Sequence, residues 1–131
     1  MTRVLDAHAL MVFLEKEPGW RKVAGRFAEA VERADRLLMT TVNYGEVLYI
    51  ILRECGPEQG EAAEDVVRSL PVEFVPVDLD LTREAARFKA SHSISYADCF
   101  AAALARTRKA ELITGDREFA LLEKSIKIDW L

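Results

Sequence analysis

The sequence predicts an α/β fold: a single domain over residues 1–131, with a central parallel sheet of about five strands and helices on both faces. Short apolar runs typical of buried strands alternate along the chain with longer segments whose apolar residues recur at helical spacing. Helices of this length provide the crossover connections that parallel strands need. The 131 residues are the size of one ordinary domain, and no linker, repeat or low-complexity tract divides them.

In the first half of the chain, we expect the strands 4–5 and 37–40 and four helices, over residues 9–17, 20–34, 43–54 and 58–70. The second helix is amphipathic, with Val23, Phe27, Ala30 and Val31 at helical spacing. Asn43 is a good cap residue, and the segment after it is apolar nearly all round, so we predict a largely buried helix. In the fourth helix, Val66, Val67 and Leu70 share one face.

In the second half, we expect the strands 72–77, 111–114 and 126–130 and helices over residues 81–90, 95–109 and 116–123. Pro76 confines the first of these strands to a strand end or a sheet edge, because proline has no backbone N–H. We expect Asp80 to cap the helix that follows. The alanines after Ser95 allow the next helix to lie close against the sheet.

Composition narrows the class of protein. Half of the residues are hydrophobic and 31% are charged, which is typical of globular proteins. No apolar run approaches the roughly 18 residues of a membrane span. An acid interrupts the apolar start of the chain and no cleavage-like ending follows, so we predict a cytoplasmic protein. Cys55 and Cys99 lie far apart in apolar helical segments, and we expect both to be small buried thiols.

Four carboxylates stand where the chain leaves a strand or enters a helix: Asp6 in RVLDAHAL, Glu46 in TTVNYGEVLYI, Asp98 in SISYADCFAAALA and Asp116 in LITGDREFALLE. Parallel strands gather their carboxyl ends at one edge of the sheet, so these acids are expected to converge there. Taken singly, each has a structural explanation. Asp6 and Asp116 fit N-caps, while Asn43-x-x-Glu46 and Ser95-x-x-Asp98 fit capping boxes.

Four acids gathered at one edge would repel one another without a cation between them. Oxygen donors of this kind suit Mg²⁺ or Mn²⁺, whereas Zn²⁺ usually recruits His or Cys. Such a metal lowers the pKa of bound water and neutralises a phosphodiester, a combination that favours hydrolysis of a phosphate backbone. Thr114 is placed to support a carboxylate or a water there. The net charge of −4 argues against a generic nucleic-acid binder, and without the four acids the chain balances at 18 acidic and 18 basic residues.

The motifs VLDAHAL, NYGEVLY, SYADCFAAALA and LITGDREF, in this order from Val4 to Phe119, resemble PIN-domain ribonucleases, and more narrowly the VapC-type toxins of prokaryotic toxin–antitoxin pairs. The resemblance implies that Asp6, Glu46, Asp98 and Asp116 form the metal site. It also implies a central parallel sheet, Mg²⁺ or Mn²⁺ dependence, homodimers and cleavage of RNA. A cognate VapB-like antitoxin would lay a C-terminal segment across the groove near the first two helices.

Other residues near these motifs have two interpretations each. Many relatives carry Ser or Thr two residues after the first aspartate, where this chain has His8, so a hydroxyl is missing there. Asp78 and Asp80 could enlarge the acidic cluster or cap a helix. Cations that could grip an RNA backbone, or form solvated helix faces, are Arg117, Lys16, Arg21, Lys22 and Arg26.

Two other functions stay open from the sequence. A receiver-like signalling module is also α/β and gathers acids around Mg²⁺, but it needs an aspartate at the end of its third strand and a lysine after its last strand. Here Lys124 and Lys127 only flank or lie within the last strand. A catalytically silent metal-binding or protein-binding domain would retain the same acids.

Overall fold

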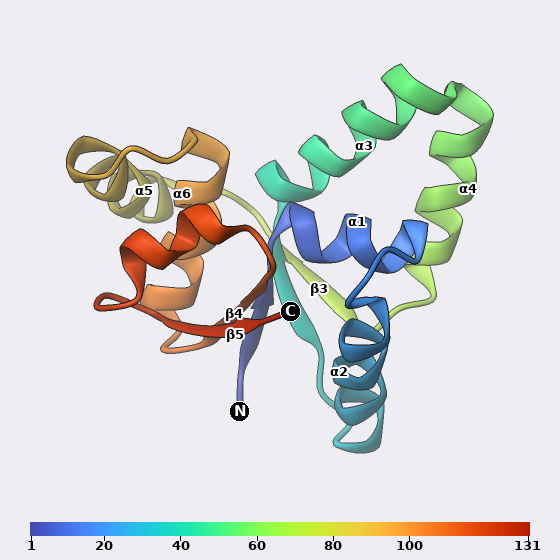
Figure 1. Cartoon of the computed structure of the whole chain (residues 1–131), viewed down its shortest axis with the longest axis horizontal. Helices are drawn as coiled ribbons and strands as arrows, with labels where there is room; N and C mark the ends of the chain where they lie inside the picture. The colour runs from blue at the N-terminus through green and yellow to red at the C-terminus, as the bar shows by residue number, and fades with distance from the viewer.

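The computed structural model describes residues 1–131 and contains a five-stranded, all-parallel sheet in the order β3-β2-β1-β4-β5 (Figure 1). The strands are β1 (Arg3–Leu5), β2 (Leu37–Thr40), β3 (Val72–Val75), β4 (Glu111–Thr114) and β5 (Lys127–Trp130). The α/β class, the parallel pairing and the five strands predicted from the sequence are confirmed.

Helices cover both faces of the sheet, as predicted (Figure 1). One face carries α1 (Ala7–Glu15), α2 (Trp20–Glu32), α3 (Thr41–Cys55) and α4 (Pro57–Arg68); the other carries α5 (Leu79–Ser91), α6 (Tyr96–Thr107) and the short 3₁₀ helix η1 (Arg117–Leu122). The chain builds the sheet outward from β1 to β3 and then crosses to β4 and β5. No helix has both the length and the apolar character needed to cross a membrane.

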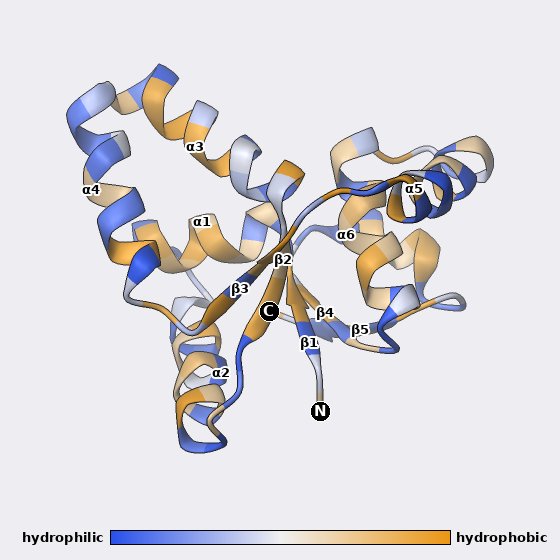
Figure 2. Ribbon diagram, turned by 180° about the vertical axis from the view of Figure 1, so that it is seen from behind, coloured by the Kyte–Doolittle hydropathy of each residue, from blue (hydrophilic) through white to orange (hydrophobic).

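Successive residues of the central strands point to opposite faces of the sheet, and both are buried. In β1, Val4 packs with α5 and α6 while Leu5 packs with α1 and α2, and both are fully buried. In β4, Leu112 and Ile113 divide in the same way. A strand covered on both sides must be apolar throughout, which explains the short continuous hydrophobic runs of the sequence (Figure 2).

Two predicted helix caps are wrong by a few residues. Thr40, not Asn43, caps α3, because the Thr40 side chain accepts the backbone N–H of Asn43. Asp78, not Asp80, caps α5, with its Oδ1 2.8 Å from the backbone N of Leu81. In each case a residue with a cap side chain stood earlier in the chain, so the helix begins sooner.

Several apolar side chains are more exposed than predicted. In α3 only Asn43, Val47 and Ile51 are buried, because this helix projects from the sheet with α4 and packs along one side (Figure 1). Val31 and Val66 are 66% and 45% exposed. The expectation of two buried thiols holds for Cys99 only, since Cys55 is exposed at the end of α3.

A half-buried ion-pair network joins the edge strand β5 to α2 and β1. The Asp129 carboxylate lies 2.7 Å from Arg26 Nε, 3.0 Å from Lys22 Nζ and 3.7 Å from Arg3 Nε. Burial would raise the pKa of Asp129, but hydrogen bonds from Arg26 and Lys22 outweigh burial and leave the pKa lowered. This network fixes the side of the sheet on which β4 and β5 end.

We expect Asp129→Ala to destabilise the protein by about 2 kcal/mol, because it strands neighbouring cations whose partner is removed. Urea unfolding at neutral pH measures the loss. The control is Asp65→Ala, which removes an exposed ion pair with Arg68 and is expected to cost less than about 0.5 kcal/mol. Equal losses in the two variants would contradict the structural role of the network.

Candidate metal and active site

The candidate site lies where β1 and β4 end side by side. Leu5 pairs with Ile113, after which the chain leaves β1 toward α1 on one face and leaves β4 toward η1 on the other. Such a divergence opens a crevice at the carboxyl edge of the sheet, where ligands of open α/β folds bind. Asp6 and Asp116 stand at its two sides.

Asp6 is 1% exposed and caps α1. Its Oδ1 accepts the backbone N–H of Ala9 at 2.7 Å, and its Oδ2 accepts the hydroxyl of Thr114 at 2.5 Å. Burial raises the pKa of Asp6 to about 7, hydrogen bonds from Thr114 and Ala9 act against the rise, and the charges of Asp98 and Asp116 add to it. Asp6 therefore serves both as a cap and as a member of the acidic group.

Thr114 connects two of the predicted acids. Its fully buried hydroxyl donates to Asp6 and accepts the backbone N–H of Asp116 at 3.0 Å. The sequence left open whether this hydroxyl supports a carboxylate or a water. The structure places it on the Asp6 carboxylate, where it orients that group toward the crevice.

Glu46 and Asp98 reach the crevice from α3 and α6. Glu46 Oε1 is buried and has no hydrogen-bond partner, and burial followed by the charge of Asp116 raises the pKa of Glu46. Burial raises the pKa of Asp98 to about 6, the Ser95 hydrogen bond lowers it, and the charges of Asp116, Glu46 and Glu118 raise it further. The four predicted acids thus act on one another electrostatically across this edge.

Glu118 joins the site, although it was not predicted. One carboxylate oxygen from each of Asp98, Asp116 and Glu118 lies within 4.8 Å of the others. Asp116 caps η1 by accepting the backbone N–H of Glu118 at 3.0 Å, which brings both side chains to the same turn. The spacing Asp-x-Glu is the signal that could have identified Glu118.

Asn43 links the two helices that carry Glu46 and Asp98. It is fully buried, and its side chain accepts from the Thr40 hydroxyl and donates from Nδ2 to the carbonyl of Ala97 at 3.0 Å. The capping box predicted for Asn43 and Glu46 is absent because α3 begins earlier. The capping residue predicted at Ser95 is present, since its Oγ accepts the backbone N–H of Asp98 at 3.2 Å.

His8 supports the turn that carries Asp116. The backbone N–H of Gly115 donates to His8 Nδ1 at 3.2 Å. A Cβ at position 115 would lie 2.7 Å from His8 Cε1, so the imidazole and the glycine backbone need each other's shape. His8 therefore contacts the site through the chain of the turn.

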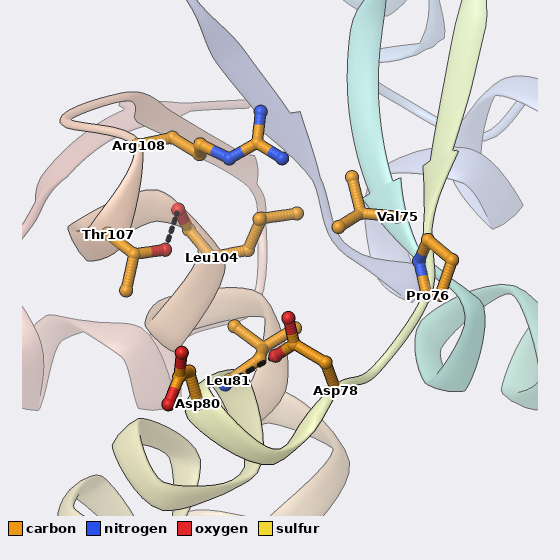
Figure 3. A pocket seen from close by; sticks show the side chains of 8 residues that line it. All are labelled: Val75, Pro76, Asp78, Asp80, Leu81, Leu104, Thr107 and Arg108. Atoms are coloured by element: carbon orange, nitrogen blue, oxygen red, sulfur yellow. Dashed lines mark hydrogen bonds between the residues drawn. The ribbon is translucent and has the colours of Figure 1, made fainter.

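Asp78 and Asp80 lie apart from the crevice. They line a separate hollow between β3, α5 and α6, together with Leu81, Leu104 and Arg108 (Figure 3). Asp78 is the α5 cap, and Asp80 pairs with Arg83 at 3.3 Å. Of the two interpretations considered for these acids, helix capping holds for Asp78, and the exposed Asp80 forms a surface ion pair.

The candidate RNA-binding cations divide into two groups. Lys22 and Arg26 are held by Asp129 and are not free to bind phosphate. Arg117, Lys16 and Arg21 are exposed and lie over tryptophan rings instead. Their role in RNA binding stays a prediction.

We expect Glu118→Gln to weaken Mn²⁺ affinity about tenfold, because the change removes one negative charge from the cluster of Asp98, Asp116 and Glu118 and leaves the side chain's size unchanged. Calorimetric titration measures the affinity. Glu58→Gln, an equal charge change in the exposed first turn of α4, is the control. Unchanged affinity in Glu118→Gln would remove Glu118 from the site.

The sequence matches the PIN domain family over residues 3–124. The chain belongs to the PIN domain family. The strand order of this PIN domain excludes the receiver alternative, because β3 lies at the edge of the sheet and is not next to β1 as in the receiver order 2-1-3-4-5. No curated protein sequence matches the chain.

Solved structures with this PIN fold include toxin–antitoxin proteins. VapBC2 from Rickettsia felis, bound to a fragment of its promoter DNA, has a TM-score of 0.80 at 15% identity, with 98% of each chain covered. DNA-bound VapBC from Salmonella typhimurium has a TM-score of 0.81 at 18% identity, covering 98% of this chain and 97% of that chain. VapC20 from Mycobacterium tuberculosis, a toxin that cleaves the sarcin-ricin loop, has 0.69 at 17%, covering 92% and 94%. At these identities the likeness shows the fold.

Proposed function

We propose that this PIN domain is a metal-dependent endoribonuclease that hydrolyses RNA phosphodiester bonds and acts as the toxin of a type II toxin–antitoxin system. One observation carries the proposal: Asp6, Glu46, Asp98 and Asp116 reach one crevice at the carboxyl edge of the sheet and raise one another's pKa. So much negative charge without a neutralising partner is unfavourable unless a cation binds.

The residues of the crevice fit a hard divalent cation. The donors are carboxylate oxygens without a cysteine among them, which suits Mg²⁺ or Mn²⁺ better than Zn²⁺. Glu46 Oε1 is buried with no hydrogen-bond partner, as expected of an oxygen whose partner is a bound ion. Asp98, Asp116 and Glu118 would hold the cation most directly, with Asp6 and Glu46 beside them.

The chain's own groups would orient the reacting partners. Thr114 and the Ala9 N–H hold Asp6 in one position, and Asn43 fixes the helices that carry Glu46 and Asp98. A bound divalent cation supplies charge neutralisation for the phosphodiester and makes water more acidic. Water is the attacking group, so no serine or cysteine nucleophile is needed.

The toxin role rests on the fold and on one surface. Several structural neighbours are VapB–VapC complexes, which supports an antitoxin as partner and a homodimer as assembly. An apolar hollow between α1, α3 and α4, lined by Leu14, Ile51, Ala63 and Val66 among others, suits an apolar antitoxin segment. We propose that a VapB-like tail binds there and directs a basic side chain to the acids.

The proposal is tested by incubating the purified chain with RNA in Mg²⁺ or Mn²⁺ and in EDTA. We expect cleavage that requires the metal and is lost in Asp98→Asn. The substitution keeps the backbone bond to Ser95 and removes only charge. The control Asp80→Asn changes an exposed carboxylate outside the crevice and should cleave normally.

Full ribonuclease activity in a verified metal-free Asp98→Asn preparation would overturn this mechanism. Metal binding without cleavage of any RNA would favour the catalytically silent domain. For the toxin role, expression of the wild type should arrest growth, Asp98→Asn should not, and co-expression of the protein encoded beside it should restore growth. Growth arrest by Asp98→Asn would contradict a toxin that acts by cleavage.

A further inference from the structure

We propose that the end of β5, beside the acids, is a binding surface for unpaired, single-stranded RNA. The surface, called here the tryptophan rim, consists of Trp20 and Trp130 with the cations that lie over them: Lys16, Arg21 and Arg117. This inference rests on the proposed ribonuclease function and names the form of RNA that the site takes.

Leu131 places the rim next to the catalytic turn. Its backbone N–H donates to the carbonyl of Thr114 at 3.0 Å, and a Cβ on Gly115 would lie 3.5 Å from Leu131 Cβ. The residue before Leu131 is Trp130. One indole of the rim is therefore separated by a single residue from the turn that carries Asp116.

The other indole approaches the same point from α2. A Cβ on Gly19 would lie 3.4 Å from Leu131 Cβ, and Trp20 follows Gly19 in the chain. Lys22, one turn further on, donates to the carbonyl of Trp130. The end of β5 thus lies against the start of α2, as the ribbon shows (Figure 1).

The two indoles lie on opposite sides of the β5 end. Trp130 packs with the core of α5 and α6, whereas the next residue, Leu131, packs with the core of α1 and α2. Trp20 begins α2 and lies on the second side. Bases stacked on both rings would pass over Leu131 and bring the backbone between them to the acids.

Each indole carries a cation on its face. The guanidinium carbon of Arg117 lies 4.6 Å from the centre of the Trp130 ring, whose Nε1–H donates to Glu123 at 3.1 Å. Arg21 and Lys16 lie 5.0 and 5.8 Å from the centre of Trp20. Both rings are half-buried, and all three cations are exposed.

The rim cations keep their positive charge available. Lys16, Arg21 and Arg117 make no ion pair, while the neighbouring Lys22 and Arg26 are neutralised by Asp129. In a chain of net charge −4, free cations beside an acidic crevice offset the repulsion that a phosphate backbone meets there.

Paired cations and indoles suit single-stranded RNA. An aromatic face stacks on any unpaired base, a cation beside it binds the phosphate, and the guanidinium stacks as well. In a duplex the bases stack on each other and their faces are closed to an indole. An acidic peptide would use the cations but has no need of two indoles.

The first experiment measures binding of a labelled oligouridylate by fluorescence anisotropy in EDTA, where no cleavage occurs. We expect the triple variant Lys16→Ala, Arg21→Ala, Arg117→Ala to bind about tenfold more weakly and to lower the salt slope by about 2. The control removes three exposed cations without ion pairs at the opposite edge of the sheet: Arg33→Ala, Arg36→Ala and Lys109→Ala. Equal losses in the two triple variants would overturn the rim.

The second experiment uses the indoles as reporters, since the chain has two tryptophans. In Trp20→Phe and in Trp130→Phe, oligouridylate should quench the fluorescence of the remaining tryptophan. Absence of quenching in either variant would overturn the two-sided arrangement. A duplex of matched length, or polyglutamate, should bind more weakly, and equal affinity for either would overturn the assignment to single-stranded RNA.

Failure of the rim and failure of the ribonuclease give different results. If the wild type cleaves RNA and the rim triple variant binds and cleaves equally well, the rim is wrong and the ribonuclease stands. If no metal supports cleavage but binding depends on the rim, the ribonuclease is wrong and the RNA surface stands. Melting temperatures should be similar in both triple variants, because no ion pair is lost.

Discussion

Asp6→Asn is expected to abolish RNA cleavage and, at the same time, to stabilise the metal-free protein. Asp6 is 1% exposed, and burial raises its pKa to about 7, so at pH 8 the fold must keep a buried carboxylate charged. Asparagine removes that charge and also one donor for the cation. We expect the cleavage rate to fall by about 1,000-fold or more.

The hydrogen bonds of position 6 suit asparagine. Its Oδ1 can accept the N–H of Ala9, as asparagine does at helix starts, and its Nδ2 can donate to Thr114 Oγ1, which the carboxylate now engages as an acceptor. The gain in metal-free stability at pH 8 is on the order of 2–4 kcal/mol, since each unit of pKa shift corresponds to about 1.4 kcal/mol.

Cleavage assays and urea unfolding in EDTA measure the two effects in one preparation. Asp35→Asn, an exposed change before β2, is the control and should alter neither. A variant that is inactive because it is unfolded would show no cooperative transition. Retained cleavage, or a clear loss of stability in EDTA at pH 8, would contradict the role given to Asp6.

The stability of the metal-free protein is expected to fall as pH rises from about 5 to 8. Asp6 and Asp98 have folded-state pKa values raised from 3.8 to about 7 and about 6. The folded state therefore binds more protons than the unfolded state, and its advantage is full below about pH 4 and is lost as pH passes the raised values. Asp129, whose pKa is lowered, acts oppositely but only in stronger acid.

A bound cation should reverse this dependence. In saturating Mn²⁺ we expect stability at pH 8 to exceed that in EDTA by several kcal/mol, and the difference to shrink toward pH 5 as protons compete for the carboxylates. Urea unfolding at several pH values, with Mn²⁺ and with EDTA, measures both curves. Stability in EDTA that is flat or rising from pH 5 to 8, or an equal effect of Mn²⁺ at both ends, would contradict the linkage.

The double variant Asp6→Asn, Asp98→Asn provides the control for this linkage. With both raised groups removed, the EDTA curve should flatten and the response to Mn²⁺ should disappear. A decline that persists in the double variant would place its cause elsewhere in the chain.

Strands, helices and the edge at which the acids meet were predictable, because they depend on patterns that are local in the sequence. Apolar runs such as VLDA and ELIT specify strands buried on both faces. A helix start after a strand puts Asp6, Asp98 or Asp116 at the carboxyl edge whatever the order of the strands. Boundaries and burial were less predictable: α3 projects from the sheet, which exposes Leu52 and Cys55.

The sequence by itself determined the α/β class, the parallel sheet and the residues that carry the acidic charge. Only the tertiary structure decided how those residues are held: Thr114 against Asp6, Asn43 between two helices, Glu118 beside Asp116, and Asp129 against the cations of α2. The physical reason is range. Periodicity and capping act within a few residues of the chain, whereas hydrogen bonds and ion pairs between Asp6 and Thr114 or between Lys22 and Asp129 exist only once the strand order brings distant segments together.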